Sequence, residues 1–348
     1  MSDLMGAFRG ILKRRSVRLD NTFFCLHYKF TVTFLMVSSI LVASRQYFGG
    51  PIDCEFAEYK KGELNNYCSA QGTFVREQTA KHGEGEEHTA KNQVRYCTYY
   101  SWVFLTLFLQ AVFFYTPHYM WKAWEGGRLK ALTSKINFPI LNERSVAEEA
   151  ERLAEYFSKS LNTHNFYAYK YFICELLNLI NIGGQILFMN RFIGDGYELY
   201  GIHVLSMNRE DMEKRMGQLF PMWTICTFEI YGLTGVKEEL EGICPLTHNP
   251  LNEKIYGFLW FWMRFVAIMT VLIIIYRIMT LLLPSFRLYL LRVTNRDQTA
   301  DEIRAVHKKL QVGDWFLLQL LGTNVNREVY KELITQLAKH DHSGVCHP

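Results

Sequence analysis

The 348-residue sequence lacks the short motifs that mark several large classes of enzyme. It contains no glycine-rich phosphate-binding loop, no His-Glu-x-x-His pair and no Gly-x-Ser-x-Gly nucleophile elbow. Its cysteines also lack the Cys-x2-4-Cys spacing that structural zinc sites use. These absences argue against nucleotide-dependent, metalloprotease and serine-hydrolase chemistry. We therefore predict a protein that is not an enzyme and that holds neither a cofactor nor a metal.

The chain also has little overall hydrophobicity, since 21% of its residues are charged and its mean hydropathy is −0.04. This average conceals four apolar windows, at residues 30–43, 99–119, 171–189 and 256–283. An apolar helix of about 20 residues crosses the hydrocarbon of a bilayer. We therefore predict an all-α membrane protein built on four transmembrane helices. The first window follows a basic segment, so a cleaved signal peptide is an alternative for it.

The four windows divide the chain into nine segments. The predicted spans are residues 28–46, 99–120, 170–190 and 256–283. Two loops, 47–98 and 191–255, would lie on one side of the membrane, and 1–27, 121–169 and 284–348 on the other.

The orientation of these segments follows from their positive charges. Lys and Arg number 22 in the N-terminal segment, residues 121–170 and residues 284–348, against 12 in the other two loops. Cytoplasmic segments carry the excess of Lys and Arg, so we predict that both termini are cytoplasmic. The net charge of +4 then reflects topology and not nucleic-acid binding.

Cysteine placement supports the same orientation. Four of the eight cysteines, Cys54, Cys68, Cys226 and Cys244, fall in the two loops predicted to lie outside. An oxidising exterior would pair them, and four cysteines admit three pairings between which spacing does not choose. The other four lie in or beside spans or in cytoplasmic segments, where we expect reduced thiols.

The start of the second window carries a recognisable motif. Residues Tyr99, Tyr100, Ser101, Trp102 and Val103 resemble the innexin signature Tyr-Tyr-Gln-Trp-Val, with Ser101 in place of Gln. Further stretches resemble insect innexins in the same order and spacing: SRQY at 44–47, PIDC at 51–54, WKAWEGGRLK at 121–130, HNFYA at 164–168, NEKIYGFLWFW at 252–262 and GDWFLL at 313–318. The run PLTH after Cys244 and the position of Arg264 inside the fourth window depart from the family pattern, as Ser101 does.

The resemblance to innexins implies a gap-junction channel subunit in the plasma membrane. Subunits would form a homo-oligomeric ring, an octamer, around an aqueous pore for ions and small molecules. Rings in opposed membranes would dock through their outer loops, and other innexin subunits and membrane lipids would be further partners. The resemblance also implies disulfides joining Cys54 to Cys244 and Cys68 to Cys226, in loops with a small β content.

Two other functions share this topology: an undocked hemichannel that releases small solutes, and a four-pass adhesion or scaffold protein. The outer loops contain no Asn-x-Ser/Thr sequon whose glycan would obstruct docking. They also contain neither Cys-Cys-Gly nor Trp-Gly-Leu-Trp, the signatures of tetraspanins and claudins. The sequence therefore favours the docked channel.

The N-terminal segment, from Ser2 to Lys13, has apolar residues at helical spacing. The resemblance implies that it forms the pore entrance, with Met1, Ser2, Asp3 and Met5 lining the pore. A ring of Asp3 side chains would then attract cations. The alternative is an amphipathic helix on the inner membrane surface.

Several polar residues interrupt the spans. On the third span, Glu175, Asn178, Asn181 and Gln185 share one face, and we predict that they hydrogen-bond inside the bundle, with exposure to the lumen as the alternative. Arg264 and Arg277 lie toward opposite ends of the fourth span, so we expect both to reach toward headgroups. Pro117, near the inner end of the second span, predicts either a gating hinge or a helix end.

The predicted cytoplasmic segments have the periodicity of helices. Apolar residues recur at three- and four-residue intervals in 148–161 and 301–310, and Asn326 could cap a helix over 327–340. Packed together, these helices would form a dome beneath the membrane.

Overall fold

The computed structural model describes residues 17–49, 52–56, 61–77, 93–97, 99–133, 143–194, 196–206, 208, 216–231 and 235–339. The chain divides into two compact units. Unit 1 comprises Met1–Leu26, Thr116–Leu179 and Met269–Pro348, and unit 2 comprises His27–Tyr115 and Ile180–Ile268.

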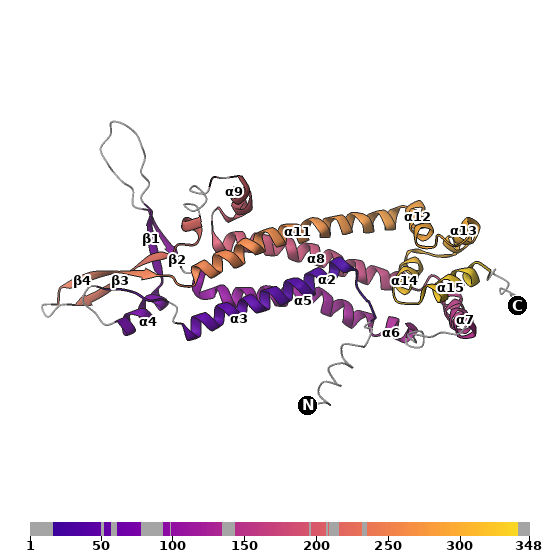
Figure 1. Ribbon diagram of the computed structural model, residues 1–348, viewed down its shortest axis with the longest axis horizontal. Coiled ribbons are helices and arrows are strands. Elements are labelled where there is room, and N and C mark those ends of the chain that lie inside the picture. Colours follow the sequence, from indigo (N-terminus) through magenta and orange to yellow (C-terminus); the bar gives the residue numbers. More distant parts are fainter. Residues whose placement is uncertain are drawn as a thin grey trace, which may run out of the picture. The chain divides into compact units, whose positions relative to one another are not determined.

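Four helical segments are long and apolar enough to cross a membrane (Figure 1), and each contributes residues to both units. They are Thr22–Phe48, Tyr99–Glu125, Asn165–Ile193 and Asn249–Leu282. The first combines α2 (Thr22–Cys25), a π-helical turn η1 (Leu26–Thr31) and α3 (Val32–Phe48), and the second combines a 3-10 turn η2 (Tyr99–Trp102) and α5 (Val103–Glu125). The third and fourth are α8 and α11. The predicted all-α class with four candidate membrane helices is thereby confirmed.

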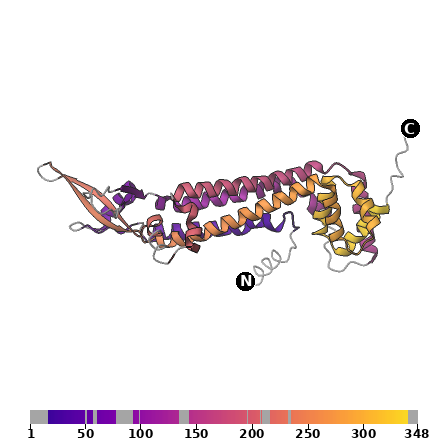
Figure 2. The same ribbon diagram turned by 90° about the horizontal axis from the view of Figure 1, so that it is seen from above.

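Unit 2 contains a four-stranded antiparallel sheet, in the order β2-β1-β3-β4. Its strands are β1 (Thr73–Glu77), β2 (Gln93–Cys97), β3 (Trp223–Tyr231) and β4 (Lys237–Pro245). The strands β3 and β4 pair from Trp223↔Pro245 to Tyr231↔Lys237 and form the twisted ribbon seen in Figure 2. The pairing Phe74↔Ile225 joins this hairpin to β1 and β2. The small β content expected of the outer loops is present, and strands from both loops join in one small sheet.

Helical contacts complete unit 2. Ser39 Oγ in α3 donates to the Phe104 carbonyl of α5 (2.7 Å), and Trp262 Nε1 in α11 donates to Thr31 Oγ1 (2.8 Å). Three short helical segments belong to the same unit: α4 (Lys61–Gln71), η3 (Tyr197–Leu199) and α9 (Tyr200–Ser206). Small hydroxyl groups thus bind neighbouring helices together in the first span.

Unit 1 also contains a group of shorter helices (Figure 1). They are α6 (Arg128–Thr133), α7 (Glu143–Lys159), α12 (Pro284–Thr294), α13 (Ala300–Lys309), α14 (Val312–Gly322) and α15 (Arg327–Lys339). Helix α15 packs against α7, α13 and α14, and buries Val329, Leu333 and Ile334. The helices predicted in 148–161, 301–310 and 327–340 are present, and Asn326 Oδ1 accepts a hydrogen bond from Glu328 N (3.4 Å), as its predicted cap role requires.

Candidate functional site

Two disulfides tie the predicted outer loops together. Cys54 pairs with Cys244 of β4, and Cys68 of α4 pairs with Cys226 of β3. All four cysteines are at most 1% exposed. This is the pairing that the family resemblance implied, and the structure confirms it.

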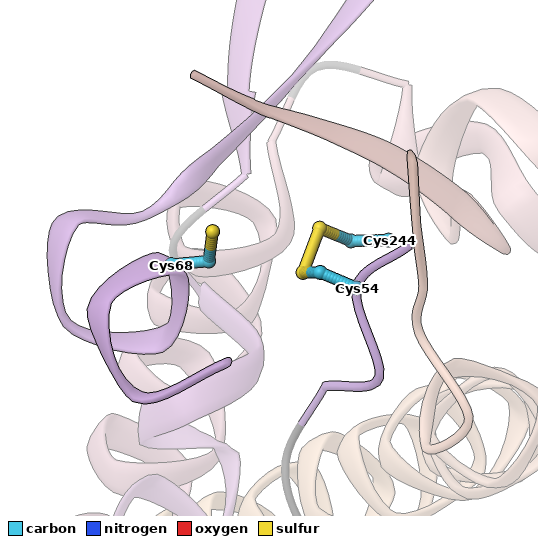
Figure 3. Close-up of side chains that lie close together, drawn as sticks. All are labelled: Cys54, Cys68 and Cys244. Carbon is cyan, nitrogen blue, oxygen red and sulfur yellow. A yellow bond between two sulfur atoms is a disulfide. The ribbon is translucent and has the colours of Figure 1, made fainter. Parts of the chain in front are cut away.

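The two disulfides lie side by side. The sulfur atoms of Cys54, Cys68 and Cys244 are within 4.8 Å of one another, and Figure 3 shows Cys68 beside the Cys54–Cys244 bond. Three clustered sulfurs resemble a metal site, but thiolate is the form of cysteine that binds metal. Because each of these sulfurs is engaged in a disulfide, the cluster is a covalent staple and not a metal site.

Hydrogen bonds reinforce the staples. Glu55 and Ile243 exchange two backbone hydrogen bonds (2.9 and 3.2 Å) next to the Cys54–Cys244 disulfide. The amide of Cys54 also donates to Asn65 Oδ1 (2.8 Å). Each disulfide is expected to stabilise the folded state by about 2–4 kcal/mol. The sheet of unit 2 is therefore fixed by covalent bonds as well as by strand pairing.

Charged side chains lie along the exposed part of the β3–β4 hairpin. Lys237 Nζ lies 2.7 Å from Glu229 and 3.4 Å from Glu239, and Arg76 of β1 forms an ion pair with Glu241. The hydrogen bond to Glu229 raises the pKa of Lys237 above its usual value. Glutamates outnumber basic side chains in these pairs, so this part of the hairpin presents a mainly acidic surface.

The signature motif at residues 99–103 connects the second span to the outer loops. The Tyr99 hydroxyl donates to the Leu219 carbonyl (3.2 Å), and the Tyr100 hydroxyl lies 3.5 Å from Thr73 Oγ1 in β1. The Ser101 carbonyl accepts from Gln46 Nε2 (3.5 Å), Val103 is fully buried and Trp102 remains 59% exposed. These contacts give the motif a structural role: it positions the sheet at the end of α5.

A buried ion pair occupies unit 1. Arg277 of α11 donates to both carboxylate oxygens of Glu175 in α8, at 2.6 and 3.0 Å, and Asn21 Nδ2 donates to Glu175 Oε1 (2.8 Å). Four aromatic rings surround the guanidinium at 5.2–5.4 Å, those of Tyr171, Phe172, Tyr276 and Phe316. Glu175 thus bonds inside the helical unit, as predicted.

The expectation that Arg277 reaches toward headgroups is wrong, because this residue is only 8% exposed and its charge is neutralised by Glu175. Arg264 has different contacts from Arg277. Its guanidinium stacks over the Trp260 ring at 4.8 Å and lies 3.5 Å from the Glu198 carbonyl.

A second buried network joins two of the motifs identified in the sequence, HNFYA at 164–168 and GDWFLL at 313–318. His164 Nδ1 lies 2.7 Å from Asp314 Oδ1, the Tyr156 hydroxyl lies 3.0 Å from His164 Nε2, and the Asn162 amide donates to Asp314 Oδ2 (2.9 Å). The backbones approach so closely that a Cβ on Gly313 would lie 2.2 Å from the carbonyl carbon of His164. The motif HNFYA and the motif GDWFLL are therefore two halves of one contact, which separate inspection of each motif missed.

Two further predictions have different outcomes. Pro117 is buried within α5, which continues to Glu125, so the helix does not end there and the hinge remains a prediction. The predicted pore-lining residues, Met1, Ser2, Asp3 and Met5, lie outside the residues that the structure describes.

Comparisons with known proteins agree with this architecture. The family model described as Innexin matches residues 20–340. The chain is 43% identical to Innexin inx2 of Schistocerca americana, with 97% of this chain and 98% of that protein covered. It is 41% identical to Innexin inx2 of Drosophila melanogaster (97% and 96% covered) and 37% identical to Innexin shaking-B of the same organism (97% and 94% covered). The chain therefore belongs to the innexin family of gap-junction channel proteins.

Proposed function

We propose that this chain is one subunit of a docked intercellular channel. Copies of the chain form a ring, which by resemblance to innexins is an octamer, around a pore that passes ions and small molecules. Two such rings, one in each of two opposed plasma membranes, dock through the stapled sheets of unit 2. The observation that carries this proposal is the pair of adjacent disulfides, because they hold both loops in one preorganised surface.

The proposed topology follows from chemistry on either side of the membrane. Disulfides persist outside the cell, so residues 47–98 and 191–255 are assigned there. The excess of Lys and Arg assigns 1–27, 121–169 and 284–348 to the cytoplasm. The spans are then 28–46, 99–120, 170–190 and 256–283.

The proposed pore entrance is the N-terminal segment. Met1, Ser2, Asp3 and Met5 line it, and one Asp3 from each subunit forms a ring of negative charge that raises the local concentration of cations. Pro117 is the proposed hinge of the second span. Its missing backbone N–H removes one helical hydrogen bond, and the boundary between the two compact units falls at Thr116, one residue earlier.

Paired-cell recording tests the docked channel. The full-length chain is expressed in both cells of a pair that lacks endogenous junctions, and junctional current is recorded together with transfer of a small dye. We expect both signals. Current across the surface membrane of single cells without junctional coupling would assign an undocked hemichannel, and surface expression without either current would assign an adhesion or scaffold protein.

A matched pair of variants tests the role of the staples. Cys54→Ser removes one staple and should abolish coupling, whereas Cys174→Ala, which removes a buried free thiol from α8, should preserve it. Normal junctions in Cys54→Ser would contradict the role of the disulfide in docking.

A further inference from the structure

A cavity of about 420 Å³ lies inside unit 1, between the start of α2 and helices α8, α11 and α14. Its volume is within the range of small-molecule sites, roughly 300–1,000 Å³. Most of its wall is hydrocarbon or aromatic, contributed by Phe23, Met269, Leu272, Ile273, Phe316 and Leu320. Such a lining favours the hydrocarbon part of a ligand.

The polar side chains in the wall are mostly engaged within the protein. Arg277 is neutralised by Glu175, Gln319 Nε2 donates to the Tyr276 hydroxyl (3.3 Å), and Thr323 Oγ1 donates to the Leu320 carbonyl (2.8 Å). Since the guanidinium already has its counterion, the cavity offers no free positive charge from Arg277 to an anionic ligand.

Asp20 is the exception. Its side chain is only 3% exposed and lines the cavity, and its Oδ2 lies 3.1 Å from His118 Nδ1. Its other oxygen, Oδ1, is buried and has no hydrogen-bond partner in the described structure. A buried carboxylate oxygen without a donor is costly. A small rotation of the Asp20 side chain toward the cavity would let a ligand there supply the donor.

The position of the cavity identifies where a ligand would come from. It borders α2, α8 and α11, which all belong to helices long and apolar enough to span a membrane. Leu272 and Phe23 at its wall are 53% and 37% exposed, so hydrocarbon from the membrane can reach it. Asp20 lies just before the start of α2, whereas Met269 and Leu272 lie within α11. The cavity is therefore polar toward the end of one span and apolar along another.

We propose that this cavity binds a membrane amphiphile whose hydroxyl or ammonium head donates a hydrogen bond to the Asp20 carboxylate, which turns toward the ligand on binding. Its hydrocarbon body lies against Met269, Leu272 and Ile273. Sterols and long-chain alcohols supply the hydroxyl, and long-chain amines supply the ammonium. Ionised fatty acids are excluded, because their carboxylate would meet the carboxylate of Asp20 without a free cation. Bound ligand would stabilise the contact of α2 with α11 and α14 by mass action.

Photolabelling of the purified full-length protein in lipid nanodiscs tests this proposal. Three diazirine-bearing probes are compared at pH 9, where a fatty acid is ionised: cholesterol, octadecylamine and stearic acid. We expect saturable labelling of peptides from 17–26, 269–277 or 316–323 by cholesterol, octadecylamine or both, and at least tenfold weaker labelling by stearic acid. The probe that labels distinguishes the hydroxyl source from the ammonium source.

Two variants locate the site. Leu272→Trp fills the cavity and should reduce labelling at least tenfold, whereas Ile275→Trp, at a position of similar exposure outside the cavity lining, should leave it unchanged. Asp20→Ala should reduce labelling about tenfold, as expected for loss of a hydrogen bond to a charged group. Each variant is first checked for wild-type elution on size exclusion, and Leu272→Trp keeps the test valid if Asp20→Ala does not fold.

Three results would overturn the proposal: equal labelling by all three probes, labelling that Leu272→Trp leaves unchanged, or cross-linking of the cavity residues to a neighbouring subunit or to residues 1–16 in place of the probe. The last result would identify protein as the occupant.

Discussion

Different interactions stabilise each of the two compact units. The sheet of unit 2 is small, and two disulfides with buried sulfurs tie it to the first outer loop. One joins β3 to α4, 158 residues apart in sequence, and the other joins β4 to Cys54, 190 residues apart. Unit 1 instead relies on apolar packing and on two buried polar networks, Glu175 with Arg277 and His164 with Asp314. A small sheet buries little apolar surface, so covalent bonds replace the missing core. Both disulfides lie in unit 2, so the described residues of unit 1 are held by non-covalent contacts.

The largest effect is expected from breaking one staple while leaving a reactive sulfur behind. In Cys226→Ser, Cys68 becomes a free thiol within 4.8 Å of the sulfurs of Cys54 and Cys244. Its thiolate can attack that disulfide, forming a new bond to one sulfur and releasing the other as a thiolate. We expect mixed pairings in peptide mass spectrometry and loss of junctional coupling.

The double variant Cys68→Ser/Cys226→Ser is the control for that exchange. It removes the same staple without a free thiol, so the Cys54–Cys244 disulfide should remain intact. Equal disulfide patterns in the single and double variants would show that the neighbouring sulfurs do not exchange.

The next largest effect is expected in unit 1, from Glu175→Gln. This change leaves Arg277 as a buried cation without its counterion, and breaking a buried pair costs about 3–5 kcal/mol. Thermal unfolding of the purified protein should show a clear loss of stability. The double variant Glu175→Gln/Arg277→Met should recover part of it, and no recovery would indicate that the ring contacts of Arg277, and not its charge, stabilise the unit.

A smaller effect is expected at the second buried network. His164→Ala leaves the buried Asp314 with the Asn162 amide as its remaining donor among the described residues, at a cost of about 1.5–3 kcal/mol for the lost charged hydrogen bond. Limited proteolysis should then cleave α7 and α14 more readily. Tyr156→Phe, which removes only the outer hydrogen bond, should cost about 1 kcal/mol, and a larger effect for it than for His164→Ala would contradict this order.

The smallest effect is expected at high pH. Burial raises the pKa of Tyr330 in α15 to about 12, above its usual value of about 10. Between pH 10 and 12 the unfolded chain loses this proton while the folded chain keeps it, so stability falls as pH rises in this window, by about 1–2 kcal/mol. Tyr330→Phe should flatten the pH dependence of unfolding there, and an unchanged slope would contradict the assignment.

The sequence predicted the elements of the fold better than their contacts. Hydropathy located the four long helices because each exceeds the length of a membrane span, and the disulfide pairing followed from family resemblance. The partner of Arg277 was missed because its charge alone suggested headgroups, and the position of Glu175 102 residues away carries no local signal. His164 and Asp314 are 150 residues apart, so only the fold brings their motifs together.

The π-helical turn Leu26–Thr31 changes how the first span should be mapped. A π-turn inserts about one extra residue into the helix, which rotates all later side chains by about 100° relative to the earlier ones. A single helical wheel drawn from Thr22 to Phe48 would therefore assign α3 to the wrong face. In a cysteine-accessibility scan of this span, the periodicity of labelling should shift phase between residues 26 and 31, and the two stretches need separate wheels.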